Sequence, residues 1–260
     1  MRDKLLIFII LSLTSCIISC KKAPLSVGPI TTESRQLESF SKVKVFDDIN
    51  LRFVKSDTNY VVITTGKNLI DNILTDINVN DSSLTIKNGN ALDWLRTYDY
   101  TLDVELHFKD VNYVFIASHG TVTTENQFNS DYNTTQNDTI ADRVKYVFEL
   151  DGASGNINLE LNNCPYLYIN YEYSTSNVII RGTNNSFLQI RKRSFGNVNA
   201  LDYQAKRAMV VSNSVANCYI NVSERLYSRI NSFGNIYYKG EPPYINNQYG
   251  PDAKGKLIHL

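Results

Sequence analysis

The chain has 260 residues, of which 43% are hydrophobic and 20% are charged, and this balance excludes a mostly disordered protein. Its 26 basic and 26 acidic side chains cancel, so composition predicts no basic surface for nucleic acid and no nucleic-acid partner. Seventeen Tyr against one Trp favour strands over helices.

Residues 1–19 have the pattern of a lipoprotein signal peptide. A short charged start precedes the uncharged run 5–19, which is too short for a membrane-spanning helix of about 20 residues. Residues 17–20, Ile-Ile-Ser-Cys, resemble the bacterial lipobox, which predicts lipid attachment at Cys20. Cys16 is the alternative, but cleavage there would leave two isoleucines on the mature arm.

A lipidated N-terminus predicts a protein that is tethered to a membrane without crossing it, because two or more acyl chains give stable anchoring. We expect an outer-membrane lipoprotein of a Gram-negative cell envelope. Lys-Lys-Ala-Pro after Cys20 lacks the acidic cluster of a surface-export signal, which favours the periplasmic face. Residues 20–36 are polar and aperiodic, so they predict a flexible tether.

The first half of the remaining chain predicts irregularly spaced strands. Apolar residues alternate with polar ones in several short runs from residue 37 onward. Apolar residues at helical spacing predict one short helix at about 67–75. A polar, Asn-rich segment at about 124–146 interrupts the pattern and predicts an excursion from the fold, of the kind that often carries function.

The second half repeats itself about every 20 residues. The tetrapeptide Ser-Phe-Gly-Asn at 194–197 returns at 232–235, and asparagines recur at intervals of 21, 20, 20 and 18 residues. Gly and Asn tolerate a left-handed backbone, which suggests that they form the corners between strands. The predicted corner residues are Gly155, Asn156, Asn177, Gly196, Asn197, Asn217, Gly234 and Asn235. Ser176 and Ala216 replace the glycine at two corners.

Such a period is typical of stacked units that bury their apolar faces against each other. Two short strands and two corners per repeat predict an all-β, parallel β-helix-like solenoid with rungs of about 20 residues. The leucine-rich repeat has a similar period, but Glu172 and Arg193 occupy positions where it requires Asn or Cys. We expect the solenoid to span 37–243 and the tail 244–260 to cap its last rung.

Several segments together resemble the head GIN domain family, autotransporter-adhesin-like domains of Gram-negative lipoproteins. The resemblance rests on 66–70, 84–86, 90–96 with Trp94, the Gly-Asn corners and the closing 236–242. It covers about 37–243. It implies the right-handed β-helix-like fold, an envelope location and an adhesin-like binding role without catalytic residues.

The sequence shows no pattern for catalysis, a metal or a cofactor. The three histidines are scattered, and no zinc-protease, nucleophile-elbow, phosphate-loop or Cys-x-x-Cys motif is present. We therefore predict no enzyme, no cofactor and no metal site. Cys164 and Cys218 occupy different places in the repeat, so we expect two buried free thiols.

A tyrosine-rich rung is the best candidate binding surface. Tyr168, Tyr171 and Tyr173, with Tyr227 further on, could stack on sugars, so the partner is expected to be a glycan or an envelope protein. Two equivalent arginines 38 residues apart, at 191 and 229, are expected to share a face. The alternatives are a carbohydrate-active enzyme, which needs two close carboxylates, and a scaffold that associates through an uncovered last rung.

Overall fold

The computed structural model describes residues 26–90, 100–125, 128 and 145–260. These residues form one large mixed sheet of eighteen strands, so the all-β prediction is confirmed. Cys16, Cys20 and Trp94, like most of the predicted excursion, lie outside the described residues. The strands are β1 Ile30–Gln36, β2 Lys42–Asp47, β3 Asn50–Lys55, β4 Tyr60–Gly66, β5 Ile73–Asn78, β6 Ser83–Asn88, β7 Asp103–Phe108, β8 Tyr113–Ser118, β9 Val122–Thr123, β10 Lys145–Asp151, β11 Ile157–Glu160, β12 Tyr166–Glu172, β13 Val178–Arg193, β14 Val198–Ser212, β15 Cys218–Ile230, β16 Ile236–Lys239, β17 Tyr244–Tyr249 and β18 Leu257–His259.

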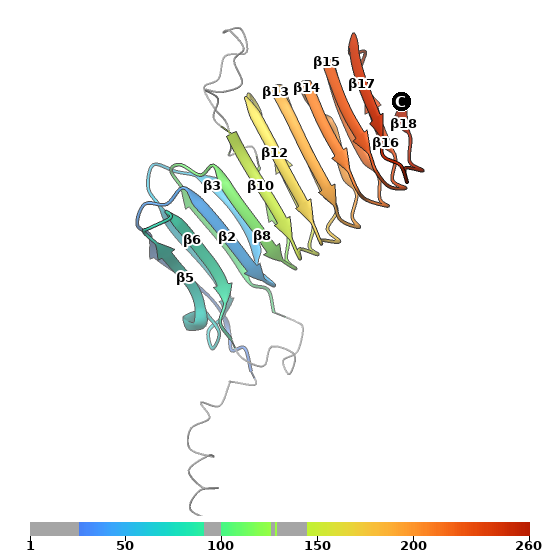
Figure 1. Ribbon diagram of the computed structural model, residues 1–260. Coiled ribbons are helices and arrows are strands. Elements are labelled where there is room, and N and C mark those ends of the chain that lie inside the picture. The colour runs from blue at the N-terminus through green and yellow to red at the C-terminus, as the bar shows by residue number, and fades with distance from the viewer. Residues whose placement is uncertain (1–25, 91–99, 126–127, 129–144) are drawn as a thin grey trace, which may run out of the picture.

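The strands pair in two ladders. The first ladder runs β5, β6, β2, β8, β10, β12, β13, β14, β15, β17, and its strands lie side by side across Figure 1. The second runs β1, β4, β7, β3, β9, β11, β13, β14, β15, β16, β18. The long strands β13, β14 and β15 take part in both. Antiparallel pairs occur only at the N-terminal end of the described sheet, at β1–β4, β4–β7 and β5–β6.

The sequence repeat sets the register of the parallel pairs. Val178 pairs with Val198, Val198 with Cys218 and Cys218 with Ile236, so each partner is the equivalent residue of the next repeat. All four side chains are fully buried. Since burying such an apolar side chain stabilises a fold by about 1.5–3 kcal/mol, the stacked rows supply much of the driving force for this half of the chain.

The corner glycines have a different physical role from the predicted one. None of Gly155, Gly196 and Gly234 has a positive φ, and neither do the repeated asparagines, so the left-handed explanation is wrong. A Cβ on Gly155 or Gly196 would lie 1.8 Å from the carbonyl oxygen of Gly120 or Ser176, respectively, on the preceding rung. Glycine is therefore required because two backbone segments approach too closely for a side chain.

The repeated asparagines form a hydrogen-bonded ladder beside these glycines. The Oδ1 atom of Asn197 accepts a bond from the backbone N–H of Asn217 at 3.0 Å, and Asn217 accepts one from Asn235 at 3.0 Å. Asn235 in turn accepts one from the N–H of Lys256 at 2.8 Å. Each side chain satisfies a backbone donor at a corner, where the strand ladder is interrupted.

Two N-terminal predictions are corrected. The predicted helix at 67–75 is a single 3-10 turn, η1 Ile70–Asn72, after which the chain enters β5 and pairs antiparallel with β6. Leu69 and Ile70 are buried at the turn, and Ile73 is buried at the start of the following strand. Their spacing therefore resembles that of a helix although only one turn forms. Within the predicted tether at 20–36, residues 30–36 form β1. Each of them pairs with a residue of β4, which offers a complete row of backbone partners along that edge.

The C-terminal tail continues the sheet instead of covering its end. Residues 244–260, predicted as a cap, contain β17 and β18, which pair in parallel with β15 and β16. Pro242 and Pro243 lie directly before β17 and do not end the ladder. The tail therefore adds one more strand to each ladder.

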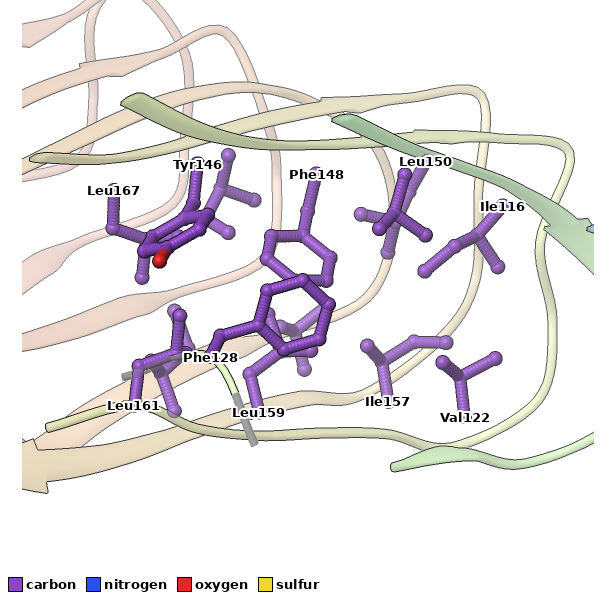
Figure 2. Close-up of a cluster of buried hydrophobic side chains, with 14 of the residues drawn as sticks. Ile116, Val122, Phe128, Tyr146, Phe148, Leu150, Ile157, Leu159, Leu161 and Leu167 are labelled. Atoms are coloured by element: carbon purple, nitrogen blue, oxygen red, sulfur yellow. The ribbon is translucent and has the colours of Figure 1, made fainter. Parts of the chain in front are cut away.

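Phe128 anchors the start of the predicted excursion in the core. Figure 2 shows its ring among the apolar side chains between the two ladders. Its ring centroid lies 5.1 Å from that of Phe53, 5.0 Å from Phe108, 5.5 Å from Tyr146 and 5.4 Å from Phe148. This aromatic cluster fills the interior where the regular rungs of the second half meet the irregular first half.

The two cysteines of the described domain are free and buried, as predicted. Burial raises the pKa of both the Cys164 and the Cys218 thiol to about 12, so neither is a reactive thiolate near neutral pH.

Candidate functional site

The outer face of the first ladder brings the two predicted arginines into one row. Arg191 of β13 pairs with Val211 of β14, which pairs with Arg229 of β15, and Gln248 of β17 follows. The prediction that the arginines share a face is confirmed. Two strand spacings separate them, which places their backbones about 10 Å apart.

A second row runs beside the arginines and carries the predicted aromatics. Tyr168, Gln189, Met209 and Tyr227 are in register on β12, β13, β14 and β15, and Asn246 of β17 completes the row. The row therefore has a tyrosine at two of its five positions, with an amide or a thioether between and beyond them.

These rows border a hollow of about 360 Å³. Its lining combines guanidinium groups, amides, one phenol and a small apolar floor, and it contains no carboxylate. The lining residues are Arg191, Arg193, Met209, Val210, Val211, Asn213, Tyr227, Ser228, Arg229, Asn231, Asn246 and Gln248. The hollow is therefore positively charged and rich in hydrogen-bond donors, which suits an anionic ligand.

The three guanidinium groups are only lightly engaged within the described chain. The Nε atom of Arg229 donates to Asn231 Oδ1 at 3.2 Å, and Arg193 lies 3.9 Å from the carboxylate of Glu172. Arg191 makes no hydrogen bond or ion pair with any described residue. Because the Arg193 pair is half-exposed and long, it contributes little stability and leaves that arginine available.

A buried lysine lies under this row of arginines. Side chains alternate between the two faces of a strand, so Lys192 points into the interior while Arg191 and Arg193 point outward. Its Nζ donates to Ser214 Oγ at 2.9 Å and to the Ala216 carbonyl at 2.6 Å. Burial lowers its pKa to about 8, so the ammonium remains mostly protonated at neutral pH. Its charge adds to the positive field of the hollow from below.

The four predicted tyrosines divide among three environments. Tyr168 and Tyr227 lie in the same outer row, and Tyr227 lines the hollow. Tyr173 is exposed at the corner after β12, with a φ of 45°. Tyr171 is fully buried, where its hydroxyl donates to the Ser176 carbonyl and burial raises its pKa to about 12. A buried side chain cannot contact an external ligand, so Tyr171 is not part of an exposed surface.

The predicted corner residues lie away from the hollow. They stack at the corner between the ladders. There the glycines Gly155, Gly196 and Gly234 allow close approach of two backbone segments, and asparagine side chains accept backbone N–H groups. Sequence reasoning missed Arg193, Met209 and the amides of the hollow. Residues 191, 211 and 229 are equivalent positions of the repeat, and this equivalence predicts that they form one row. Asn246 and Gln248 were not predicted, because the tail was assigned to a cap.

A second hollow of about 320 Å³ on β3 and β7 contains two carboxylates, Asp103 and Glu105. Asp103 accepts a bond from Asn50 Nδ2 at 2.9 Å, and Glu105 pairs with the Arg52 guanidinium, which lowers the pKa of Glu105. A glycosidase needs one carboxyl group whose pKa is raised. This arrangement therefore does not support acid catalysis, and the described residues contain no cluster that could hold a metal ion.

The sequence of the chain decides its family. A family profile described as "Putative auto-transporter adhesin, head GIN domain" matches residues 39–242. The chain belongs to this family. The match begins just before β2 and ends just before β17, so it includes the central part of both ladders and all of the arginine-bearing strands β13 and β15.

Solved structures share the fold of this head GIN domain at low sequence identity. A putative adhesin from Bacteroides fragilis NCTC 9343 has a TM-score of 0.70 at 16% identity, over 89% of this chain and 97% of that one. A putative adhesin from Parabacteroides merdae ATCC 43184 has a TM-score of 0.57 at 17% identity, over 90% and 97%. A putative lipid binding protein from Parabacteroides distasonis ATCC 8503 has a TM-score of 0.55 at 15% identity, over 90% and 97%.

No match was found among curated proteins. Within the part of the chain that the structure describes, no helix is long and apolar enough to span a bilayer.

Proposed function

We propose that this head GIN domain is a non-enzymatic, adhesin-like binding module of the cell envelope whose arginine hollow binds an acidic glycan. We further propose that its parallel ladders form a right-handed β-solenoid, which the register of equivalent residues in successive repeats supports. In this arrangement the outer face of the first ladder is a rigid platform, and the ligand lies across its strands.

The observation that carries the proposal is the unpaired guanidinium of Arg191 in a hollow with two further arginines and no carboxylate. Arginine binds a carboxylate group through two parallel hydrogen bonds, which makes it the preferred side chain for this planar anion. Arg191 and Arg229 lie in one row across the strands, with Val211 between them. The row therefore presents two guanidinium groups that can each bind a carboxylate.

The remaining lining favours a sugar as the carrier of those charges. Asn213, Asn231, Asn246 and Gln248 offer amides that can both donate to and accept from hydroxyl groups. Tyr227 is 37% exposed and offers an aromatic face against which a sugar ring can stack. A polyhydroxylated, anionic chain uses all three kinds of group together.

Calorimetric titration with a galacturonate oligosaccharide tests the proposal, with the neutral galactose oligosaccharide of equal length as a comparison. We expect binding of the acidic chain alone, weakened by added salt. Arg191→Gln and Arg229→Gln should each weaken binding about tenfold or more, since a hydrogen bond to a charged group contributes about 1.5–3 kcal/mol.

Arg181→Gln is the matched control. Arg181 is an exposed arginine on the same strand, but it belongs to the second ladder and lies outside the hollow. Equal affinity for the neutral chain, or wild-type affinity in both hollow variants, would rule the proposal out. Binding to phosphatidylglycerol vesicles without binding to the oligosaccharide would assign the hollow to an anionic lipid instead of a sugar. One structural neighbour is a putative lipid binding protein.

For the envelope location we propose lipid attachment at Cys20 and placement on the periplasmic face of the outer membrane. The signal-like run at 5–19 and the two lysines after Cys20 support this location. Labelling with palmitate should be lost in Cys20→Ala and retained in Cys16→Ala. Protease added to intact cells should leave the labelled protein uncut, whereas its digestion would place the protein on the cell surface.

A further inference from the structure

The last strand of the first ladder, β17, has a free edge and uncovered core positions. It pairs with β15 on one side, and no described strand pairs with the other. Ile245 is in register with Leu226, and Tyr249 with Ile230, and both of these partners are fully buried. Ile245 and Tyr249 are nevertheless 42% and 56% exposed. They occupy positions that a further strand would bury.

The composition of β17 is unusual for a sheet edge. Natural edge strands commonly carry charged side chains that prevent pairing with another molecule. The sequence of β17, Tyr-Ile-Asn-Asn-Gln-Tyr, contains no charge. At the opposite end of the sheet, β1 carries Glu33 and Arg35 and β5 carries Asp76. The two ends therefore differ in charge, and only the C-terminal end lacks this protection.

We propose that β17 is the docking surface for a second copy of this chain, in a twofold-symmetric dimer. A twofold axis perpendicular to the sheet brings β17 against the same strand of the partner in antiparallel pairing. An uncharged strand is its own electrostatic complement, and the pairing buries Ile245 and Tyr249 of both copies while satisfying the free backbone groups of both edges.

The charges at the other end select this geometry over a head-to-tail contact. Head-to-tail stacking would bury the Glu33–Arg35 ion pair of β1 at the contact, and removing both charges from water is costly. The contact therefore closes at two copies and does not propagate into a fibre.

Dimerisation would also join the two arginine hollows. Asn246 and Gln248 project from β17 on the outer face and line the hollow. Antiparallel pairing in one sheet keeps the outer faces of the two copies on the same side, so the hollows would adjoin across the axis. A long polymeric ligand could then engage both copies of the dimer, which increases avidity without any new contact.

Sedimentation equilibrium of the full chain in a density-matched detergent tests the dimer independently of any ligand. We expect a dimer for the wild type and a monomer for Ile245→Lys, which places an ammonium at a core-facing position of the pairing strand. Ile30→Lys is the control at the opposite end, because Ile30 is 58% exposed on the edge strand β1. This variant should remain a dimer. Tyr249→Lys is a second disrupting variant, and circular dichroism checks that each variant is folded.

A monomeric wild type at all concentrations would overturn the proposal. Open-ended oligomers, or loss of association in Ile30→Lys as well as in Ile245→Lys, would show a head-to-tail contact and would also overturn it. A dimer that persists in both folded β17 variants would place the interface elsewhere on the molecule.

Discussion

Gly196→Ala is expected to lower the free energy of unfolding by about 3 kcal/mol or more, at the upper end of overpacking costs. The new Cβ would lie 1.8 Å from the carbonyl oxygen of Ser176 and 2.1 Å from the hydroxyl of Tyr171. The nearest obstacle is the backbone of the preceding repeat, so the strain can be relieved only if the two repeats move apart. In a domain of this size the midpoint of thermal unfolding should fall by about 10 °C.

Gly152→Ala is the matched control, because it isolates the effect of backbone conformation. Gly152 has a φ of +76° and nothing within 4 Å of a built Cβ, so alanine is strained there but meets no neighbour. Its cost should be about 1–2 kcal/mol. If Gly196→Ala costs no more than Gly152→Ala in thermal unfolding, close approach of the rungs does not explain the corner glycines.

Phe128→Ala should destabilise the protein by about 3–5 kcal/mol, because it opens a cavity in the centre of an aromatic cluster. Phe128 is 2% exposed, and its ring contacts those of Phe53, Phe108 and Phe148 from strands of both halves of the sheet. Its loss should therefore loosen the junction between the irregular and the regular half. The shift of the urea midpoint, with the slope of the transition, measures the effect.

Phe195→Ala provides the comparison for Phe128, because it removes the same number of atoms from the surface. Phe195 is 68% exposed at a corner of the repeat, and a substitution there should change stability by about 0.5 kcal/mol or less. Similar midpoints for the two alanine variants would mean that Phe128 is not an anchor of the core.

The repeat period predicted the strand register because identical positions must stack when equivalent units pair in parallel. The period directly predicts the stacked row of Val178, Val198, Cys218 and Ile236. The reason for the corner glycines did not follow, since a glycine needed for φ and a glycine needed for close approach look the same in a sequence. Only the distance from Gly196 to the preceding rung distinguishes them.

The candidate site was predicted in part for the same reason. The spacing of 38 residues placed Arg191 and Arg229 on one face, because it equals two repeats. Tyr171 was misassigned, since a tyrosine is compatible with either face of a strand and the alternation across 166–173 was crowded with aromatics. The amides of β17 were missed because the tail from residue 244 onward was assigned to a cap and not to a strand of the ladder.

The ladder of asparagine side chains shows a further limit. The sequence reveals the spacing of Asn197, Asn217 and Asn235, and a turn preference explains asparagine equally well. The structure shows that each Oδ1 accepts a backbone N–H of the next repeat. The residue is therefore selected for an interaction between rungs, which a single repeat cannot display.

A crystal structure with a galacturonate trisaccharide tests the central claim most directly, because it shows where an acidic sugar chain binds. We predict that its carboxylates lie against the guanidinium groups of Arg191 and Arg229, with a sugar ring over Tyr227 and hydroxyl groups at the amides of β17. An oligosaccharide bound elsewhere, such as in the hollow of Asp103 and Glu105, with the arginines left free, would contradict the assignment of this surface.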